Sequence, residues 1–190
     1  MSYIKGAIGH LRTINRHRRL VRKHCFRIGL IRQGLMHDLS KYSPTEFIVG
    51  AKYFQGTRSP NNAEREAIGY SSAWLHHKGR NKHHYEYWID YNVRGKDPDA
   101  PVLIPVEMPK KYLAEMIMDR IAASKVYCGK NYKDDDSLKY FLSGIEKAPM
   151  HPNTSRDLEF YLRMLADKGE KETFKAIRQM LKEDKKNGRA

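Results

Sequence analysis

The sequence predicts an all-α protein, a compact single-domain helical bundle of seven to nine helices, and three observations support this class. Apolar residues recur at spacings of three, four and seven along most of the 190 residues, as they do on one face of an α-helix. No segment of any length alternates apolar and polar residues as a half-buried strand would. Two Ser-Pro pairs precede periodic segments, a pattern that is typical of helix starts.

The apolar spacing predicts four helices in the first half of the chain, over about residues 3–30, 32–41, 44–54 and 60–74. Ser43 is the predicted N-cap of the third helix, with Pro44 at its first position and Glu46 completing a capping box. Ser59, which also precedes a proline, marks the start of the fourth helix. A turn is expected at residues 79–81.

The second half is predicted to begin with a short helix over residues 83–91 and a loop over residues 93–108, which holds three of the eight prolines. Four helices are expected after this loop, over about residues 109–128, 137–147, 155–168 and 170–185. We therefore expect residues 1–130 to form the helical core and residues 131–190 to form an extension packed on it.

Charge and composition limit the cellular setting and the kind of partner. Lys and Arg number 36 against 22 Asp and Glu, a formal net charge of +14, and no carboxylate occurs between Lys5 and Arg32. Such a chain can bind nucleic acid, an anionic membrane surface or a small phosphorylated substrate, or its charges can simply solvate exposed faces. It has two cysteines, no apolar run long enough to span a membrane and no secretion signal, so we expect a cytoplasmic protein without disulfide bonds.

Histidine placement is the most informative feature, because eight of the nine histidines lie between His10 and His84. His10, His17 and His24 are seven residues apart and therefore share one stripe of the first predicted helix. The neighbours of His17 at helical spacing are mostly apolar, so this ring is expected to point into the core. It is either a core histidine hydrogen-bonded to a backbone carbonyl or a metal ligand.

His37 and Asp38 offer an imidazole and a carboxylate, a suitable mixed pair for a borderline divalent metal. Adjacent residues on a helix project about 100° apart, so the two side chains can reach one ion only near a helix end or bend. Asp119 lies among Met116 and Ala122 at helical spacing and is also expected to face a core. A carboxylate buried there needs a cation, either a metal ion or an arginine.

The order of these motifs resembles the HD-domain metal-dependent phosphohydrolases, an all-helical superfamily. The chain reads HRRLV from residue 17, HDLSK from residue 37 and DRIAASK from residue 119. The resemblance implies one divalent ion with four ligands, His17, His37, Asp38 and Asp119. His24 is a rival to His17 as the first ligand. The strings HDLSKYSPTEF and AWLHHKGRNKHHYEYW also look like a family of uncharacterised bacterial proteins, a likeness that indicates no substrate.

Two His-His pairs form a second cluster, which consists of His76, His77, His83 and His84. In the two-metal branches of the HD superfamily, extra histidines between the His-Asp pair and the last aspartate bind a second ion, and this segment resembles that arrangement. The Gly-Tyr-Pro motif of the cyclic-dinucleotide branch is absent, so a cyclic-dinucleotide phosphodiesterase is not expected. Alternatively these histidines hold phosphate or pack against Trp74 and Trp88, and either member of each pair could point inward.

Four cations near these motifs are the predicted phosphate-binding residues, Lys41, Lys78, Arg80 and Lys82. In single-metal HD nucleotidases the position of Lys41 often holds a glutamate that acts as acid or base, so the lysine here favours phosphate binding. A solvent-exposed lysine at a helix C-terminus is the alternative. The predicted catalytic residues are Asp38 and Lys41.

The predicted function is therefore a metal-dependent phosphohydrolase that attacks a phosphate ester or anhydride, of nucleotide-like chemistry, through a metal-activated water. The expected cofactor is one or two ions of Mn, Fe, Co, Ni or Zn. Two alternatives stay open, an HD-type di-iron oxygenase and a basic nucleic-acid-binding protein whose histidines are structural or hold a structural metal. Expected partners are the phosphorylated substrate, a nucleic acid under the second alternative and a second copy of the chain, with no membrane.

Overall fold

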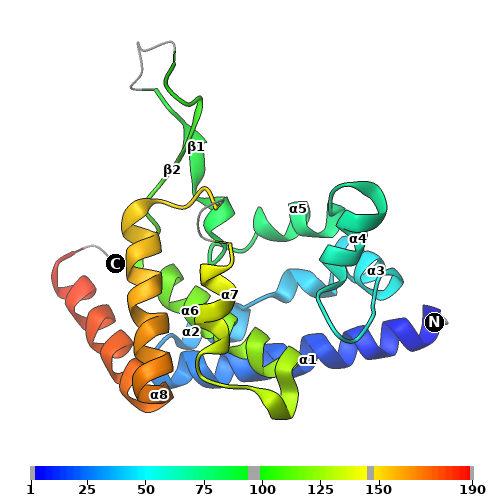
Figure 1. Cartoon of the computed structure of the whole chain (residues 1–190), viewed down its shortest axis with the longest axis horizontal. Helices are drawn as coiled ribbons and strands as arrows, with labels where there is room; N and C mark the ends of the chain where they lie inside the picture. The colour runs from blue at the N-terminus through cyan, green and yellow to red at the C-terminus, as the bar shows by residue number, and fades with distance from the viewer. Residues whose placement is uncertain (1–2, 94–98, 145–147, 189–190) are drawn as a thin grey trace. The chain divides into compact units, whose positions relative to one another are not determined.

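Figure 1 shows the computed structural model of the chain, which describes residues 3–93, 99–144 and 148–188. The structure is 72% helical, and its described part contains eight α-helices and one two-stranded sheet, which confirms the all-α class. None of these described helices is long and apolar enough to cross a membrane. Contacts divide the chain into two compact units, Met1–Asn81 with Ala122–Asn131 and Lys82–Ile121 with Tyr132–Ala190.

The described residues of the first unit form α1 (Tyr3–Ile28), α2 (Ile31–Met36), the 3-10 helix η1 (Leu39–Tyr42), α3 (Pro44–Lys52), α4 (Pro60–Ile68) and α5 (Ser72–Lys78). Those of the second unit form the 3-10 helix η2 (Tyr85–Tyr87), the strands β1 (Ile89–Tyr91) and β2 (Leu103–Pro105), and the helices α7 (Asp136–Leu142) and α8 (Pro152–Lys186). Helix α6 (Lys110–Cys128), followed by η3 (Gly129–Asn131), contributes residues to both units.

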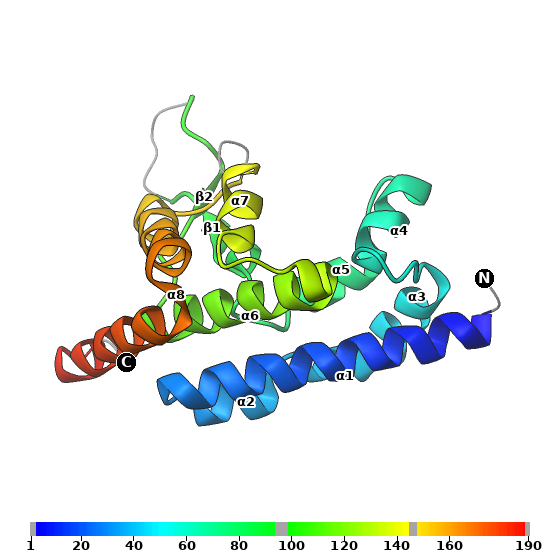
Figure 2. The same cartoon turned by 60° about the horizontal axis from the view of Figure 1, so that its bottom comes forward.

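Helix α1 is the longest helix of the first unit and packs against α2 and α3 (Figure 2). Its buried residues are Gly6, His10, Ile14, His17, Val21, His24, Cys25 and Ile28. The three histidines predicted to share one stripe are all buried, and the inward orientation predicted for His17 is confirmed. Gly50 of α3 allows a close approach here, because the ring of His10 occupies the space that a Cβ at this position would need.

The prediction of one continuous helix over residues 32–41 is wrong for its C-terminal half. α2 ends at Met36, Asp38 has a left-handed backbone conformation with φ 54°, and η1 follows. Arg18 of α1 stabilises this break, because its guanidinium donates hydrogen bonds to the backbone oxygens of Leu35 (3.1 Å) and His37 (2.7 Å). Carbonyl groups at the end of α2 are thus bound by a side chain from another helix, which the local sequence does not reveal.

The helix predicted over residues 60–74 is two helices instead of one. Gly69, with φ 84°, ends α4, and the hydroxyl of Ser71 caps α5. Glu64 is buried at this corner, where its carboxylate accepts hydrogen bonds from the hydroxyls of Ser71 (2.5 Å) and Ser72 (2.6 Å). The corner is therefore fixed by a buried carboxylate that satisfies the start of the second helix.

In the second unit η2 and a β-hairpin replace the helix predicted over residues 83–91 and part of the loop predicted over residues 93–108. β1 and β2 are antiparallel, with Asp90 opposite Ile104 (Figure 1). Strands of three residues are too short to show an alternating pattern, and these two pair across a long connection. The sequence therefore carries no signal from which this pairing could be predicted.

The two helices predicted over residues 155–168 and 170–185 form α8, whose helical backbone is interrupted at Gly169 (φ 72°, ψ 178°). The helix changes direction on either side of this residue (Figure 1). Its buried apolar residues include Leu158, Leu162, Leu165, Phe174 and Ile177. α7 begins at Asp136, close to its predicted start, but it ends at Leu142 and a turn follows, so the helix predicted to residue 147 is too long. Residues 145–147 lie outside the described residues.

Candidate metal centre

The candidate site of the first unit forms around Asp38, at the break between α2 and η1. Asp38 is fully buried, and among the described residues it is the one non-glycine residue with a positive φ. A left-handed backbone costs free energy at a non-glycine residue and is often found at functional sites. Because the helix ends at Met36, His37 and Asp38 do not share a helix and can point toward one place.

Three atoms from α1 and this break lie close together. Nε2 of His37 lies 3.4 Å from Oδ2 of Asp38, Nε2 of His17 lies 3.6 Å from the same oxygen, and the two nitrogens are 3.4 Å apart. All three residues are buried. The centre of a triangle with these sides lies about 2.0 Å from each corner, a typical length for a zinc–nitrogen or zinc–oxygen bond. These atoms are therefore spaced to bind one divalent ion together.

Positive groups surround the Asp38 carboxylate. Nζ of Lys41, predicted as a catalytic and phosphate-binding group, lies 2.6 Å from Oδ2. Burial by itself would raise the pKa of Asp38, but the charges of His37, Lys41 and His77 hold that pKa well below its usual value. Asp38 is therefore ionised at neutral pH and serves as an acceptor or a metal ligand rather than as a proton donor.

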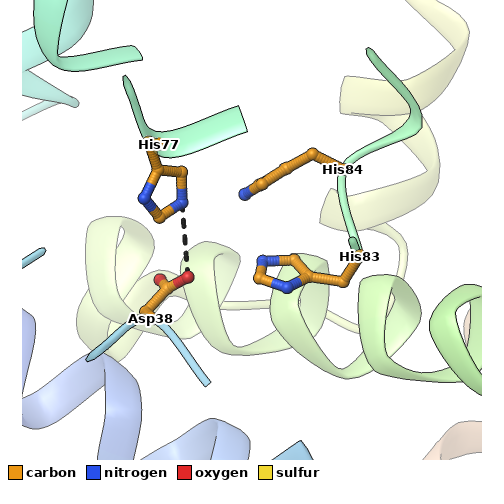
Figure 3. Close-up of side chains that lie close together, drawn as sticks. All are labelled: Asp38, His77, His83 and His84. Atoms are coloured by element: carbon orange, nitrogen blue, oxygen red, sulfur yellow. Dashed lines mark ion pairs between the residues drawn. The ribbon is translucent and has the colours of Figure 1, made fainter. Parts of the chain in front are cut away.

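The other oxygen of Asp38 faces His77, which comes from α5 (Figure 3). Nε2 of His77 lies 3.3 Å from Oδ1 of Asp38, while Nδ1 lies 2.8 Å from Oε2 of Glu46. Because an ionised carboxylate only accepts hydrogen bonds, both ring nitrogens of His77 face acceptors, and Nδ1 carries a proton toward Glu46. Burial lowers the pKa of His77, but the charge of Asp38 and the hydrogen bonds to Asp38 and Glu46 raise it on balance, so the ring donates from Nε2 as well. A metal ion would replace the proton at Nε2 and leave the one at Nδ1 on Glu46. Carboxylates commonly hold metal-ligating histidines in this way. The ring also packs on Trp74, with centroids 5.5 Å apart.

Glu46 is a residue whose role the sequence analysis missed. Ser43 caps α3 as predicted and accepts a hydrogen bond from the backbone N–H of Glu46 (3.4 Å), but the Glu46 carboxylate turns to two histidines. Its Oε1 lies 2.7 Å from Nδ1 of His76. Burial would raise the pKa of Glu46, and the hydrogen bonds from both histidines lower it on balance. One sequence signal could have indicated that Glu46 is buried. It lies four residues before Gly50, which packs against α1, so the two residues share one face of α3.

Ser40 and Asn81 complete the surroundings of His77, and neither was predicted. Nδ2 of Asn81 donates hydrogen bonds to the backbone oxygen of His77 (2.8 Å) and to Oγ of Ser40 (2.8 Å). Oγ of Ser40 lies 3.2 Å from Nδ1 of the same histidine. The C-terminal end of α5 is thus held beside the Asp38 break by polar contacts, which fixes the orientation of the His77 ring.

In the second unit the rings of the predicted ligands His83 and His84 lie against each other at a tilt of 49°, with centroids 4.1 Å apart. Nδ1 of His83 lies 3.1 Å from Oε1 of Glu115 on α6, and both residues are buried. This pair repeats the contact between Glu46 and an imidazole. Glu115 was not predicted, although it lies one helical turn before Asp119, which is half-buried on the same helix.

The other predicted phosphate-binding residues lie at the end of α5 and beyond it. Lys78 is half-buried and Arg80 is exposed in the first unit. Lys82, in the second unit, is exposed, and its Nζ lies 5.4 Å from the centre of the Tyr87 ring. Within the part of the chain that the structure describes, no ion pair fixes the role of these cations, so phosphate binding stays a prediction for each of them.

The other two histidines of the α1 stripe have different surroundings from His17. His10 packs against the rings of Phe47 and Phe54, with centroids 5.5 and 6.1 Å away, and burial lowers its pKa to about 4. It is therefore a neutral core histidine. His24 is also buried and belongs to none of the possible ligand groups among the described residues, so the structure places His17 rather than His24 beside Asp38.

Comparison with known proteins adds a family but no activity. Residues 6–164 match the model of a family of unknown function, DUF5662. No protein of curated function and no solved structure matches the chain.

Proposed function

Because the chain belongs to DUF5662, a family of unknown function, we propose its activity from the site itself. The protein is a metal-dependent phosphohydrolase that cleaves a phosphate ester or anhydride. One observation carries the proposal, namely the buried triangle of two imidazole nitrogens and an ionised carboxylate oxygen whose dimensions suit a divalent ion. The order of the motifs along the chain, which resembles that of the HD-domain phosphohydrolases, supports phosphate chemistry.

The donor set fits the borderline transition metals Mn, Fe, Co, Ni and Zn, which all accept imidazole and carboxylate ligands. Asp38 presents Oδ2 to the imidazoles of His17 and His37 and Oδ1 to that of His77, so its carboxylate suits either one ion or two. By the resemblance, which rests on sequence, the remaining ligands are Asp119 and the second pair of histidines.

A bound divalent ion would lower the pKa of a coordinated water, to about 7 in favourable cases, and polarise a phosphoryl oxygen. The chain's own residues prepare the site for this chemistry. Asp38 supplies the negative charge that attracts the ion, and its burial keeps competing water away from the ligand atoms. Glu46 holds the proton of His77 at Nδ1, so that Nε2 stays directed at Asp38.

Lys41 is the cation placed to bind the substrate phosphate. Its ammonium group forms an ion pair with the buried Asp38, while 29% of its side chain is exposed to solvent. Lys41 is therefore accessible to a substrate from solvent and lies next to the metal ligands. With an ion held by Asp38, the ammonium of Lys41 would no longer be needed to neutralise this carboxylate and could bind a phosphate oxygen. The preference for a nucleotide-like substrate comes from the resemblance alone.

The test is phosphate release from nucleoside mono-, di- and triphosphates in the presence of each of the five metals. Asp38→Asn keeps the size of the side chain and removes its charge, so we expect turnover to fall at least about 100-fold. Asp167→Asn, at an exposed position of α8, is the matched control and should retain full turnover.

Two results would contradict the proposal. Equal turnover in the Asp38→Asn variant would remove this carboxylate from the reaction. Tightly held iron with an absorption band and no phosphate release from any substrate would assign the site to dioxygen chemistry instead.

A further inference from the structure

The outward side of α1 carries cations that the metal centre does not use. Arg12, Arg16, Arg19 and Lys23 follow one another at spacings of four, three and four residues, so they share one side of the helix, away from the buried histidines. All four are exposed. We refer to these four residues as the outward cation row.

No carboxylate compensates this row along its own helix. The first carboxylate of the sequence is Asp38, which is fully buried in the metal centre. Like charges three or four residues apart repel one another and destabilise a helix. Arg16 donates a hydrogen bond to the backbone oxygen of Lys125 (3.4 Å). This carbonyl group is neutral and belongs to another basic residue, so the contact does not compensate the charge of the row. The row therefore retains an unfavourable repulsion that a polyanionic partner would relieve.

Two exposed cations of the second unit are arranged differently, because each has an acidic partner nearby in the sequence. On α8, Nη2 of Arg163 lies 2.7 Å from Oε1 of Glu159, one turn earlier. At the start of α7, Nζ of Lys139 lies 2.7 Å from Oδ2 of Asp135. Such local pairs are what a merely solvated helix face commonly shows. The absence of any acidic residue along α1 thus distinguishes this helix from the solvated faces of the second unit.

The composition of the outward side favours a nucleic acid over a membrane. A helix that lies in a membrane surface needs apolar residues along its whole buried face. Here the exposed large apolar residues lie at the two ends of the helix, and the turns between them present guanidinium and ammonium groups. They are Tyr3, Ile4, Ile8 and Leu11 in the first turns and Phe26 near the end. The row spans roughly 16 Å, which corresponds to about five successive phosphates of one strand.

We propose that the outward cation row of α1 binds the phosphate backbone of a nucleic acid, without sequence preference, while the opposite side of the same helix supplies His17 to the metal centre. Guanidinium groups suit this partner because they bind phosphate oxygens in pairs. The two functions use different faces of one helix. The proposal does not depend on the phosphohydrolase activity.

The test measures the fluorescence anisotropy of a labelled 20-nucleotide strand and of a 20-base-pair duplex over a range of salt concentrations. For four phosphate contacts, log Kd should rise with log salt concentration with a slope of about 3 to 4. The row variant carries Arg12→Gln, Arg16→Gln, Arg19→Gln and Lys23→Gln. Its affinity should fall at least about tenfold, and its slope should fall by about one for each residue removed.

A matched control removes the same charge from another exposed helix face. It carries Lys171→Gln, Lys175→Gln, Lys182→Gln and Lys185→Gln, all at exposed positions of α8. Its affinity should stay within about twofold of that of the unmodified protein, because net charge alone contributes little at moderate salt. Circular dichroism verifies that each variant folds. If the row variant does not fold, Arg19→Gln alone should still lower the slope by about one.

Three results would overturn the proposal. The unmodified protein could fail to bind either probe at low salt, or the row variant and the control could lose affinity equally, which would assign binding to net charge. Binding to phosphatidylserine vesicles without binding to either probe would assign this face to an anionic membrane. Asp38→Asn should leave nucleic-acid affinity unchanged, so failure of this proposal and failure of the phosphohydrolase proposal are distinguishable.

Discussion

His10 and His17 lie seven residues apart on α1 and are both buried, yet their surroundings give them different chemistry. His10 meets two phenylalanine rings and the backbone at Gly50, and burial lowers its pKa to about 4. His17 meets an imidazole and an ionised carboxylate at the break between α2 and η1. Helical spacing therefore determines that a histidine faces inward, and the segment opposite determines whether it is a core residue or a candidate ligand.

The largest expected effect is a difference in metal affinity between two substitutions on this helix. His17→Ala removes one of the three clustered ligand atoms, so we expect metal affinity to fall at least about 100-fold. His10→Gln alters a core position away from the carboxylate and should change affinity by less than about threefold. Calorimetric titration with Zn or Mn measures both. Equal losses in the two variants would show that the comparison between these histidines is wrong.

A smaller loss of metal affinity is expected when the support of His77 is removed. Glu46→Gln weakens the acceptor of the Nδ1 proton and allows the ring to change tautomer, so affinity should fall about 10- to 100-fold. Glu64→Gln neutralises another buried carboxylate, one that accepts only hydroxyl and backbone hydrogen bonds, and serves as the control. If both variants bind metal as tightly as the unmodified protein, Glu46 does not position the site.

The smallest expected effect is a change in how stability depends on pH. The pKa of His10 is about 4 in the folded protein and near 6.5 in the unfolded chain. As pH falls below 6.5 the unfolded chain takes up this proton first, so the contribution of His10 to stability is present above that pH and is lost as pH approaches 4. His10→Gln should lack this contribution. Urea unfolding midpoints of both proteins between pH 7.5 and 4.5 measure the difference, and parallel curves would refute it.

Much of the fold could be predicted because its signals are local. Apolar spacing predicted α1, the Ser-Pro pair predicted the start of α3, and Gly169 separates the two predicted segments of α8. The break at Asp38 could not be predicted, because the donors that stabilise it come from Arg18, on a different helix. The short β-hairpin left no periodic pattern to recognise.

The residues of the candidate site also divide into those that the sequence could predict and those that it could not. His17, His37 and Asp38 were selected from their residue types and the resemblance, and the structure brings their ligand atoms together. Glu46 was missed because a capping box already explained a glutamate at that position, while its carboxylate binds histidines some thirty residues later in the chain. Long-range contacts of this kind are fixed by packing and have no counterpart in local sequence patterns.

The central claim, that this break is a metal centre, is tested most directly by elemental analysis of the untagged protein and of the His37→Ala plus Asp38→Ala variant. The account predicts one or two equivalents of a transition metal per chain in the unmodified protein and none in the variant. Absence of metal from the unmodified protein, together with no uptake when Mn, Fe, Co, Ni or Zn is added, would contradict it.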